Sequence, residues 1–219
     1  MVVIHSVGPV IMPWVDHPNI KAIVWPGLPG QESGNSLADI ITGKVNPSAR
    51  LPYTIAKDAS DYNAKPSPDA DIEYSEKLLM GYKWFDHKNI TPQYEFGYGL
   101  SYTSFKYDNL KVSAKRDGKS SKVTATVSVK NSGSVDGAEI VQAYLTFPDN
   151  AGEPPKLLRG FEKVFIKKGK YETVKFTLGS TELSIWDTES ASWVIPSGKF
   201  ILHIGASSRD IKKSASFTL

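Results

Sequence analysis

The chain has 219 residues, of which 40% are hydrophobic and 22% charged, and its formal net charge is +3 at pH 7. This composition is ordinary for a soluble globular protein and allows one large domain or two smaller ones. The absence of cysteine excludes a disulfide framework, a thiolate metal site and a cysteine nucleophile. No apolar run approaches the ~20 residues that span a bilayer, and no signal-peptide pattern is present, so we expect no membrane partner.

A short basic cluster is the only sequence feature that suggests a nucleic-acid partner. It consists of Lys163, Lys167, Lys168, Lys170 and Lys175. The cluster falls in a strand–turn–strand pattern, which is typical of a solvated hairpin tip. We therefore predict no nucleic-acid binding.

Residues 1–51 have α/β character. Val2–Ile4 and Ala22–Trp25 are short, uniformly apolar runs of the kind found in parallel strands covered on both faces. A short helix is expected from Pro9 to Val15, and a longer one from Gln31 to Thr42 after a loop rich in glycine and proline. Two strands with one or two helices are too few for a stable doubly wound sheet, so this block is expected to be incomplete and to expose a strand edge.

Residues 52–100 carry several prolines and little periodicity, and they read as an extended connector. The connector and the residues just after it are rich in aromatic side chains, which we expect to anchor it across a seam between two domains; an exposed platform for stacking a ligand is the alternative. These side chains are Tyr82, Trp84, Phe85, Tyr94, Phe96, Tyr98 and Tyr102.

Residues 101–219 change to a period of two. Apolar residues alternate with polar ones in several runs, such as 122–129, 141–147, 173–178 and 200–204. Turn signals separate the runs, for example Asn131-Ser132-Gly133 and Pro196-Ser197-Gly198. About seven short strands at this spacing predict an immunoglobulin-like antiparallel β-sandwich, and without a Cys–Trp–Cys arrangement it is the fibronectin type III-like kind. The fold class is therefore α+β overall, with a partial α/β block followed by the sandwich.

Pairs of carboxylates are the candidate catalytic groups in this sequence, because a sugar hydrolase needs two of them on rigid elements. The candidates in the first hundred residues are Asp16, Glu32, Asp39, Asp86 and Glu95. Glu32 is the most interesting of them, because it begins the predicted helix behind a glycine-rich loop. An acid that complements the helix dipole or caps the helix is the simpler interpretation.

Other motifs carry less chemistry. The loop Gly27–Gly34 lacks the Lys-Ser/Thr pair of a phosphate loop, and Glu32 would repel phosphate. The histidines at 5, 17, 87 and 203 show no metal-ligand spacing, so no metal or other cofactor is expected. Asn89-Ile90-Thr91 is a formal N-glycosylation sequon, weakened by the proline that follows it.

Several long motifs resemble glycoside hydrolase family 3 β-glucosidases, especially fungal ones. They are Trp25-Pro-Gly-Leu-Pro-Gly-Gln-Glu-Ser-Gly-Asn-Ser-Leu-Ala-Asp, Tyr94-Glu-Phe-Gly-Tyr-Gly-Leu-Ser-Tyr-Thr-Ser-Phe, Pro155-Lys-Leu-Leu-Arg-Gly-Phe-Glu-Lys-Val and Gly205-Ala-Ser-Ser. The resemblance extends from Val2 to Leu219. It implies that residues 1–51 form the last part of an α/β sandwich, 52–100 a connector and 101–219 a fibronectin type III-like domain.

The resemblance also implies what is missing. The family has a (β/α)₈ barrel and retains anomeric configuration, but its nucleophile and acid/base segments lie upstream of the part that this chain matches. Glu32 does not match the catalytic motif, so no catalytic residue is predicted, and no substrate-binding residue is assigned. The implied parent is secreted, glycosylated and involved in cellulose degradation, and its upstream barrel and the rest of its α/β sandwich are the implied partners.

Three functions follow for the chain itself. It is first an accessory, structural part of a retaining β-glucosidase that is inactive alone. It is alternatively an assembly piece whose exposed strand edge pairs with another copy or with the missing catalytic part. It is lastly a carbohydrate-binding module, in which the sandwich or the aromatic segment from Tyr82 to Tyr102 holds glycans; Trp186 and Trp193 are candidates, although we expect both side chains to pack in the core.

Overall fold

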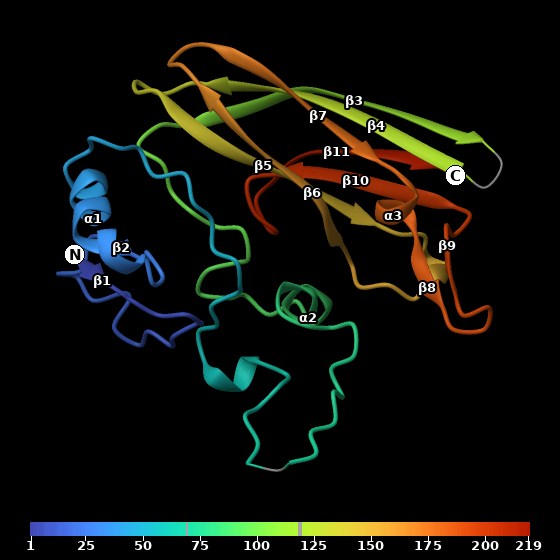
Figure 1. The fold of residues 1–219 in the computed structure, drawn as a ribbon, viewed down its shortest axis with the longest axis horizontal. Coiled ribbons are helices and arrows are strands. Elements are labelled where there is room, and N and C mark those ends of the chain that lie inside the picture. Colours follow the sequence, from blue (N-terminus) through green and yellow to red (C-terminus); the bar gives the residue numbers. More distant parts are fainter. Residues whose placement is uncertain (69, 118–119) are drawn as a thin grey trace.

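In a computed structural model, which describes residues 1–68, 70–117 and 120–219, the chain forms a β-sandwich with an irregular connector and a small N-terminal block beside it (Figure 1). In the N-terminal block, β1 (Val2–Val3) and β2 (Ile23–Val24) pair in parallel. They precede η1 (Gly30–Glu32) and α1 (Ser33–Ile41). The predicted parallel pairing and the predicted longer helix are confirmed.

The helix expected from Pro9 to Val15 is wrong. The segment instead contains a turn, in which the Val15 amide donates to Met12 O at 3.1 Å. Pro13 has no amide proton to contribute to a helix, and its ring disfavours helical geometry at the residue before it.

The N-terminal block buries very little. Among residues 1–50, all of which the structure describes, Met12 is the only buried apolar residue. The apolar residues of α1 are only partly covered, and Ile41 is 45% exposed. Because a short helix and a two-residue ladder gain most of their stability from packing, β1, β2 and α1 have little apolar support, and polar contacts such as Tyr102 Oη donating to Ile40 O at 2.7 Å attach the block to the rest of the chain.

The connector folds back on itself. Its regular elements are η2 (Ala59–Asp61) and α2 (Tyr82–His87), and an isolated antiparallel bridge joins Ile55 to Tyr94. Ile55 and Phe85 are almost completely buried, at 0% and 1% exposure. The connector therefore has a small apolar centre of its own and is more compact than the extended segment that its prolines predict.

The sandwich contains two antiparallel sheets, one in the order β11-β10-β5-β6 and the other in the order β3-β4-β7. The strands are β3 (Phe105–Asp117), β4 (Ser120–Asn131), β5 (Gly137–Thr146), β6 (Leu157–Ile166), β7 (Tyr171–Leu178), β10 (Lys199–Gly205) and β11 (Ile211–Thr218). Two short helices, η3 (Asp149–Ala151) and α3 (Ser180–Leu183), lie in connections between strands. The predicted fold class, a small α/β part followed by an antiparallel sandwich, is confirmed.

Alternation along the strands builds the core between the two sheets. Inward side chains from both sheets are buried, and they include Val123, Val127, Val141, Leu145, Phe176, Phe200, Leu202 and Ile204. On β7 the buried residues alternate with exposed ones, as the period of two predicts. The lysines of the predicted hairpin tip between β6 and β7 are exposed.

Trp186 and Trp193 do not pack in the core, contrary to the sequence-based expectation. They lie on β8 (Ile185–Asp187) and β9 (Ser192–Val194), which form a separate two-stranded hairpin outside both main sheets. Trp186 is 50% exposed and Trp193 is 66% exposed. The register pairs the two residues, so both side chains project from the same face of the hairpin.

The difference in burial predicts a difference in backbone opening. We expect the amides of β1, β2 and α1 to exchange with solvent at least ~100-fold faster than those of β4, β5 and β10, because opening the N-terminal block exposes little apolar surface. Native-state hydrogen exchange followed by mass spectrometry measures both regions in one sample. Equal protection in the two regions would contradict this assignment.

Candidate functional site

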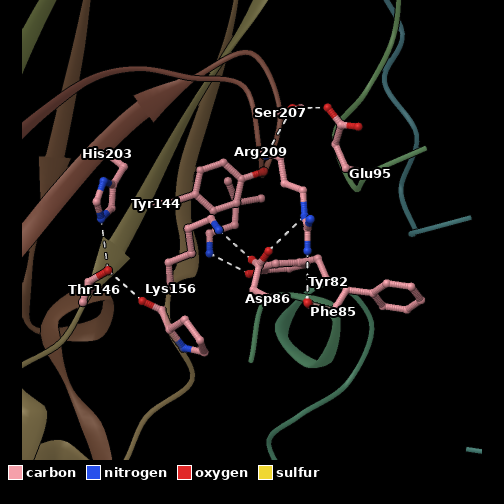
Figure 2. Close-up of polar contacts among 12 residues, drawn as sticks. Tyr82, Phe85, Asp86, Glu95, Tyr144, Thr146, Lys156, His203, Ser207 and Arg209 are labelled. Carbon is pink, nitrogen blue, oxygen red and sulfur yellow. Dashed lines mark hydrogen bonds and ion pairs between the residues drawn. The ribbon is translucent and has the colours of Figure 1, made fainter. Parts of the chain in front are cut away.

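The most developed polar site lies at the seam between the connector and the outer face of the β11-β10-β5-β6 sheet (Figure 2). At its centre is Asp86 on α2, whose carboxylate is 2.6 Å from Lys156 Nζ and 3.3 Å from Arg209 Nε. The Asp86 side chain is only 8% exposed, so its charge is balanced mainly by these two cations. Lys156 lies just before β6, and Arg209 lies in the β10–β11 loop, so this cluster fastens α2 to two parts of the sandwich.

Arg209 also completes the C-terminal end of α2. Its Nη2 donates to Phe85 O at 3.0 Å and to Ile90 O at 2.7 Å. Backbone carbonyls at a helix end lack partners within the helix, and a guanidinium there both satisfies them and complements the helix dipole. A loop of the sandwich thus helps to define where this six-residue helix ends.

Aromatic rings and buried amides extend the seam toward β5. The ring of Tyr82 stacks on Phe96 at 4.7 Å and meets the edge of Tyr144 at 5.9 Å, and its hydroxyl accepts a hydrogen bond from Leu158 N. Tyr144 is fully buried and donates to Gln142 Oε1 at 2.6 Å. The predicted role of the connector aromatics as anchors agrees with these contacts.

The side-chain amide of Gln142 forms hydrogen bonds with backbone carbonyls of both the connector and the β10–β11 loop. Its Nε2 donates to Gly97 O at 3.0 Å and to Ala206 O at 2.6 Å. Gly97 has φ +81°, and a β-carbon there would overlap Gln142 Oε1. Only glycine therefore lets the connector approach β5 this closely.

A second buried ion pair fastens the beginning of the connector. Arg50 Nη2 lies 2.8 Å from Glu139 Oε1, and both side chains are at least nine-tenths buried, at 8% and 5% exposure. Burial raises the pKa of Glu139, and the Arg50 guanidinium opposes that rise. A charged pair in this position orients the chain, because removing either partner leaves an unpaired charge inside the protein.

The candidate carboxylates do not form a catalytic pair in this arrangement. Asp86 is taken up by Lys156 and Arg209, and Glu95 accepts a hydrogen bond from Ser207 Oγ at 2.8 Å. Asp39 pairs with Lys44 at 3.0 Å. Both seam carboxylates thus have structural partners.

Glu32 and Asp16 lie outside the seam. Glu32 Oε2 accepts a hydrogen bond from Asn35 Nδ2 at 2.7 Å, within the first turn of α1, which agrees with a structural role. Asp16 is exposed, in the turn after Pro13. Among the residues that the structure describes, no group of three or more histidines, aspartates and glutamates is placed to hold a metal ion.

The Asn89 side chain at the predicted sequon is exposed, so modification there is sterically possible. The residue also has a local structural role, because it follows α2 with a left-handed φ of +52°. Asparagine tolerates this conformation better than most residues, which gives a reason for its identity that is independent of glycosylation. Glycosylation at Asn89 stays a prediction.

Comparison with known proteins places these features in a family. Residues 1–102 match the glycosyl hydrolase family 3 C-terminal domain, and residues 139–208 match the fibronectin type III-like domain. The chain corresponds to the C-terminal part of family 3 β-glucosidases. Within the described parts of the chain, no helix is long and apolar enough to cross a membrane.

Similar proteins come from several fungi and from bacteria. A probable β-glucosidase L of Aspergillus fumigatus is 47% identical over 99% of this chain and 32% of its own length. The crystal structure of a β-D-glucoside glucohydrolase from Trichoderma reesei superposes with a TM-score of 0.94 at 45% identity, covering 99% of this chain and 33% of that one. A β-glucosidase of Bifidobacterium adolescentis gives 0.90 at 36% identity, with 100% and 32% covered. The chain thus spans about a third of the length of these relatives.

Sequence reasoning missed the ion cluster, although each member lies in or beside a motif that it singled out. Asp86 was weighed as a catalytic acid, Lys156 belongs to the motif that begins at Pro155, and Arg209 follows Gly205-Ala-Ser-Ser. Their convergence depends on the β10–β11 loop meeting α2 across more than a hundred residues. The available signal was weak: Lys156 lies inside one motif, Arg209 directly after another, and Asp86 next to the aromatic residues Trp84 and Phe85.

Removing the Asp86 carboxylate tests the importance of the seam. We expect Asp86→Ala to lower the free energy of unfolding by about 2–3 kcal/mol, because two cations lose their partner while retaining some solvent contact. Urea denaturation measures the change. Asp39→Ala, which removes an exposed ion pair, serves as the matched control and should cost less than about 1 kcal/mol. Equal costs for the two variants would contradict the assignment.

His203 predicts a pH dependence at the same seam. Its Nε2 lies 3.0 Å from Thr146 Oγ1, and its Nδ1 lies 2.8 Å from Ser214 Oγ. Burial, and secondarily the charge of Lys156, lowers the pKa of His203 in the folded state below its ordinary value of 6.5. As the pH falls, His203 therefore binds a proton in the unfolded chain before it does so in the folded chain. The free energy of unfolding should then decrease below about pH 6.5.

The measurement is the urea midpoint at pH 7.5 and pH 5.0 for the wild type and for His203→Gln. We expect the variant to show a smaller difference between the two pH values. The exposed His17→Gln variant is the control and should behave as the wild type does. An unchanged pH dependence in His203→Gln would exclude this histidine as the source.

Proposed function

We propose that this chain is an accessory, structural part of a retaining β-glucosidase, which hydrolyses terminal β-D-glucosyl residues, and that the chain alone does not catalyse the reaction. The observation that carries the proposal is the set of contacts at the seam, which supports a structural role in clamping the connector to the sandwich. The Asp86 ion cluster, the edge-to-face contact of Tyr82 with Tyr144 and the Arg50–Glu139 pair just before the connector hold the connector on the sandwich. The carboxylates of the seam are occupied by structural partners and are not free for acid/base work.

The proposed partners are the catalytic barrel and the rest of the α/β domain of a family 3 enzyme. The poor burial of residues 1–50 supports this, because a parallel pair and an amphipathic helix need further strands and helices to cover them. The clamp would then hold the missing α/β layer in a fixed position relative to the sandwich. Secretion of the parent, and its glycosylation, form part of the same proposal by family resemblance.

Self-pairing through the exposed edges of β1 and β2 is the second candidate. The same observation favours it, since the two-residue strands have unpaired edges that another copy can extend. Light scattering at tens of micromolar distinguishes the two, because a monomer would argue against self-pairing.

The direct test is an activity measurement on the pure chain. With 4-nitrophenyl β-D-glucoside we expect no release of nitrophenol above that of a mock-purified sample, because no pair of carboxylates is available for a retaining mechanism. Glu32→Gln should give the same blank result. Turnover by the wild type that disappears in Glu32→Gln would overturn the proposal.

A replacement chimera tests the positive half of the proposal. This chain would be substituted for the matching third of the Trichoderma reesei glucohydrolase, to which it is 45% identical. We expect hydrolysis to be retained, because the parts that carry the chemistry remain. Asp86→Ala in the chimera should lower the temperature of inactivation more than Asp39→Ala does. A folded chimera without activity would contradict the accessory role.

A further inference from the structure

The β8–β9 hairpin presents two tryptophan rings to solvent. Trp186 and Trp193 are cross-strand partners, 50% and 66% exposed, with ring centroids 5.6 Å apart and ring planes at 73°. Figure 1 shows the hairpin at the end of the molecule remote from β1 and β2. The rings therefore lie away from the block that the missing α/β layer would cover.

The hairpin holds the two rings in a defined position. Ile185 and Ile195, both at the base of the hairpin, pack against the sandwich core. The tip is closed by Asp187 Oδ2, which accepts hydrogen bonds from both the amide and the hydroxyl of Ser190. Ser190 Oγ lies 2.8 Å from Ser192 Oγ. These two residues attach the hairpin to the core, and neither tryptophan belongs to that cluster.

Exposed indole rings on an anchored hairpin are typical of a contact surface. Large aromatic side chains leave apolar area in water at a cost, unless a ligand or partner covers them. An edge-to-face pair leaves ring faces open, and these faces carry the negative end of the ring quadrupole. The C–H groups on the flat face of a pyranose ring are slightly positive and apolar, so they complement an open indole face.

The charges on the hairpin indicate which kind of ligand the exposed rings can bind. The hairpin segment, residues 185–195, carries two acidic residues, Asp187 and Glu189, and no lysine or arginine of its own, while Arg159 and Arg116 reach only its flanks at Ser184 and Ser197. The two carboxylates at the hairpin tip disfavour contact with nucleic acids and anionic lipid surfaces. A neutral ligand with many hydroxyl donors is compatible with it, because carboxylate and serine oxygens accept hydrogen bonds from hydroxyl groups. The combination of open rings and acceptor groups describes a carbohydrate.

We propose that the Trp186–Trp193 face binds a neutral glycan, specifically a single β-glucan chain, with a glucosyl ring stacked on an exposed indole. The choice of glucan rests on the proposed function as part of a β-glucosidase. The angle of 73° between the ring planes does not form the flat platform that a crystalline cellulose surface needs. The site therefore takes a soluble chain, which it holds near the parent enzyme.

Affinity gel electrophoresis of the chain tests this with hydroxyethylcellulose and laminarin as the immobilised glucans. We expect the wild type to be retarded by at least one of them, and Trp193→Ala and Trp186→Ala to lose at least tenfold in affinity. Phe161→Ala is the matched control, because this ring is 64% exposed but lies on β6, and it should be retarded as the wild type is. Trp193→Leu replaces Trp193→Ala if the smaller side chain lowers the melting temperature.

Three results would overturn the proposal. The first is migration of the wild type that neither glucan changes. The second is equal retardation of the wild type and the folded tryptophan variants. The third is a concentration-dependent dimer that Trp193→Ala abolishes without any glucan binding, which would make the face a contact between copies. These results are independent of the test of the proposed function. The chimera's turnover of a small aryl glucoside does not require these two rings, so the accessory role can hold or fail whatever the gel shows.

Discussion

The buried carboxylate of Asp86, between Lys156 and Arg209, is the interaction on which the arrangement of this chain most depends. The connector has little regular structure and only a small apolar centre, so its conformation must be supported from outside. The ion cluster provides that support at one point, and Arg50–Glu139 provides it at another. A charge taken out of water tolerates few alternative positions for its partners, and for this reason the two clusters orient the connector more than they stabilise it.

The connector depends on the sandwich, but the sandwich does not depend on the connector. The sandwich has its own core and needs no help from the first hundred residues to bury its inward side chains. The connector needs the sandwich, since α2 ends against Arg209 and Gly97 lies directly over Gln142. The N-terminal block comes last, because almost nothing in this chain covers it. The burial of apolar side chains therefore decreases from the C-terminal half toward the N-terminus.

The sequence predicted best where one side-chain pattern decides the structure. Alternation at Val123–Val129 or Val174–Leu178 reports directly which face is buried, so the sandwich could be recognised. The ion cluster could not, because its members are joined only by tertiary contacts. The exposure of Trp186 and Trp193 was mispredicted for a related reason: their size favours the core in general, but three-residue strands outside the sheets offer no core to enter.

Two of the surfaces of the sandwich that carry aromatic groups differ in a way that supports different roles. At the seam, Tyr82 and Tyr144 are covered and their hydroxyls have hydrogen-bond partners, which is the state of an interface already filled. At the hairpin, the rings contact mainly each other and remain open. Because the connector occupies the first surface, only the second of these two surfaces leaves its rings open to a ligand. A module that clamps with one face and contacts a glucan with another needs no catalytic residue for either task.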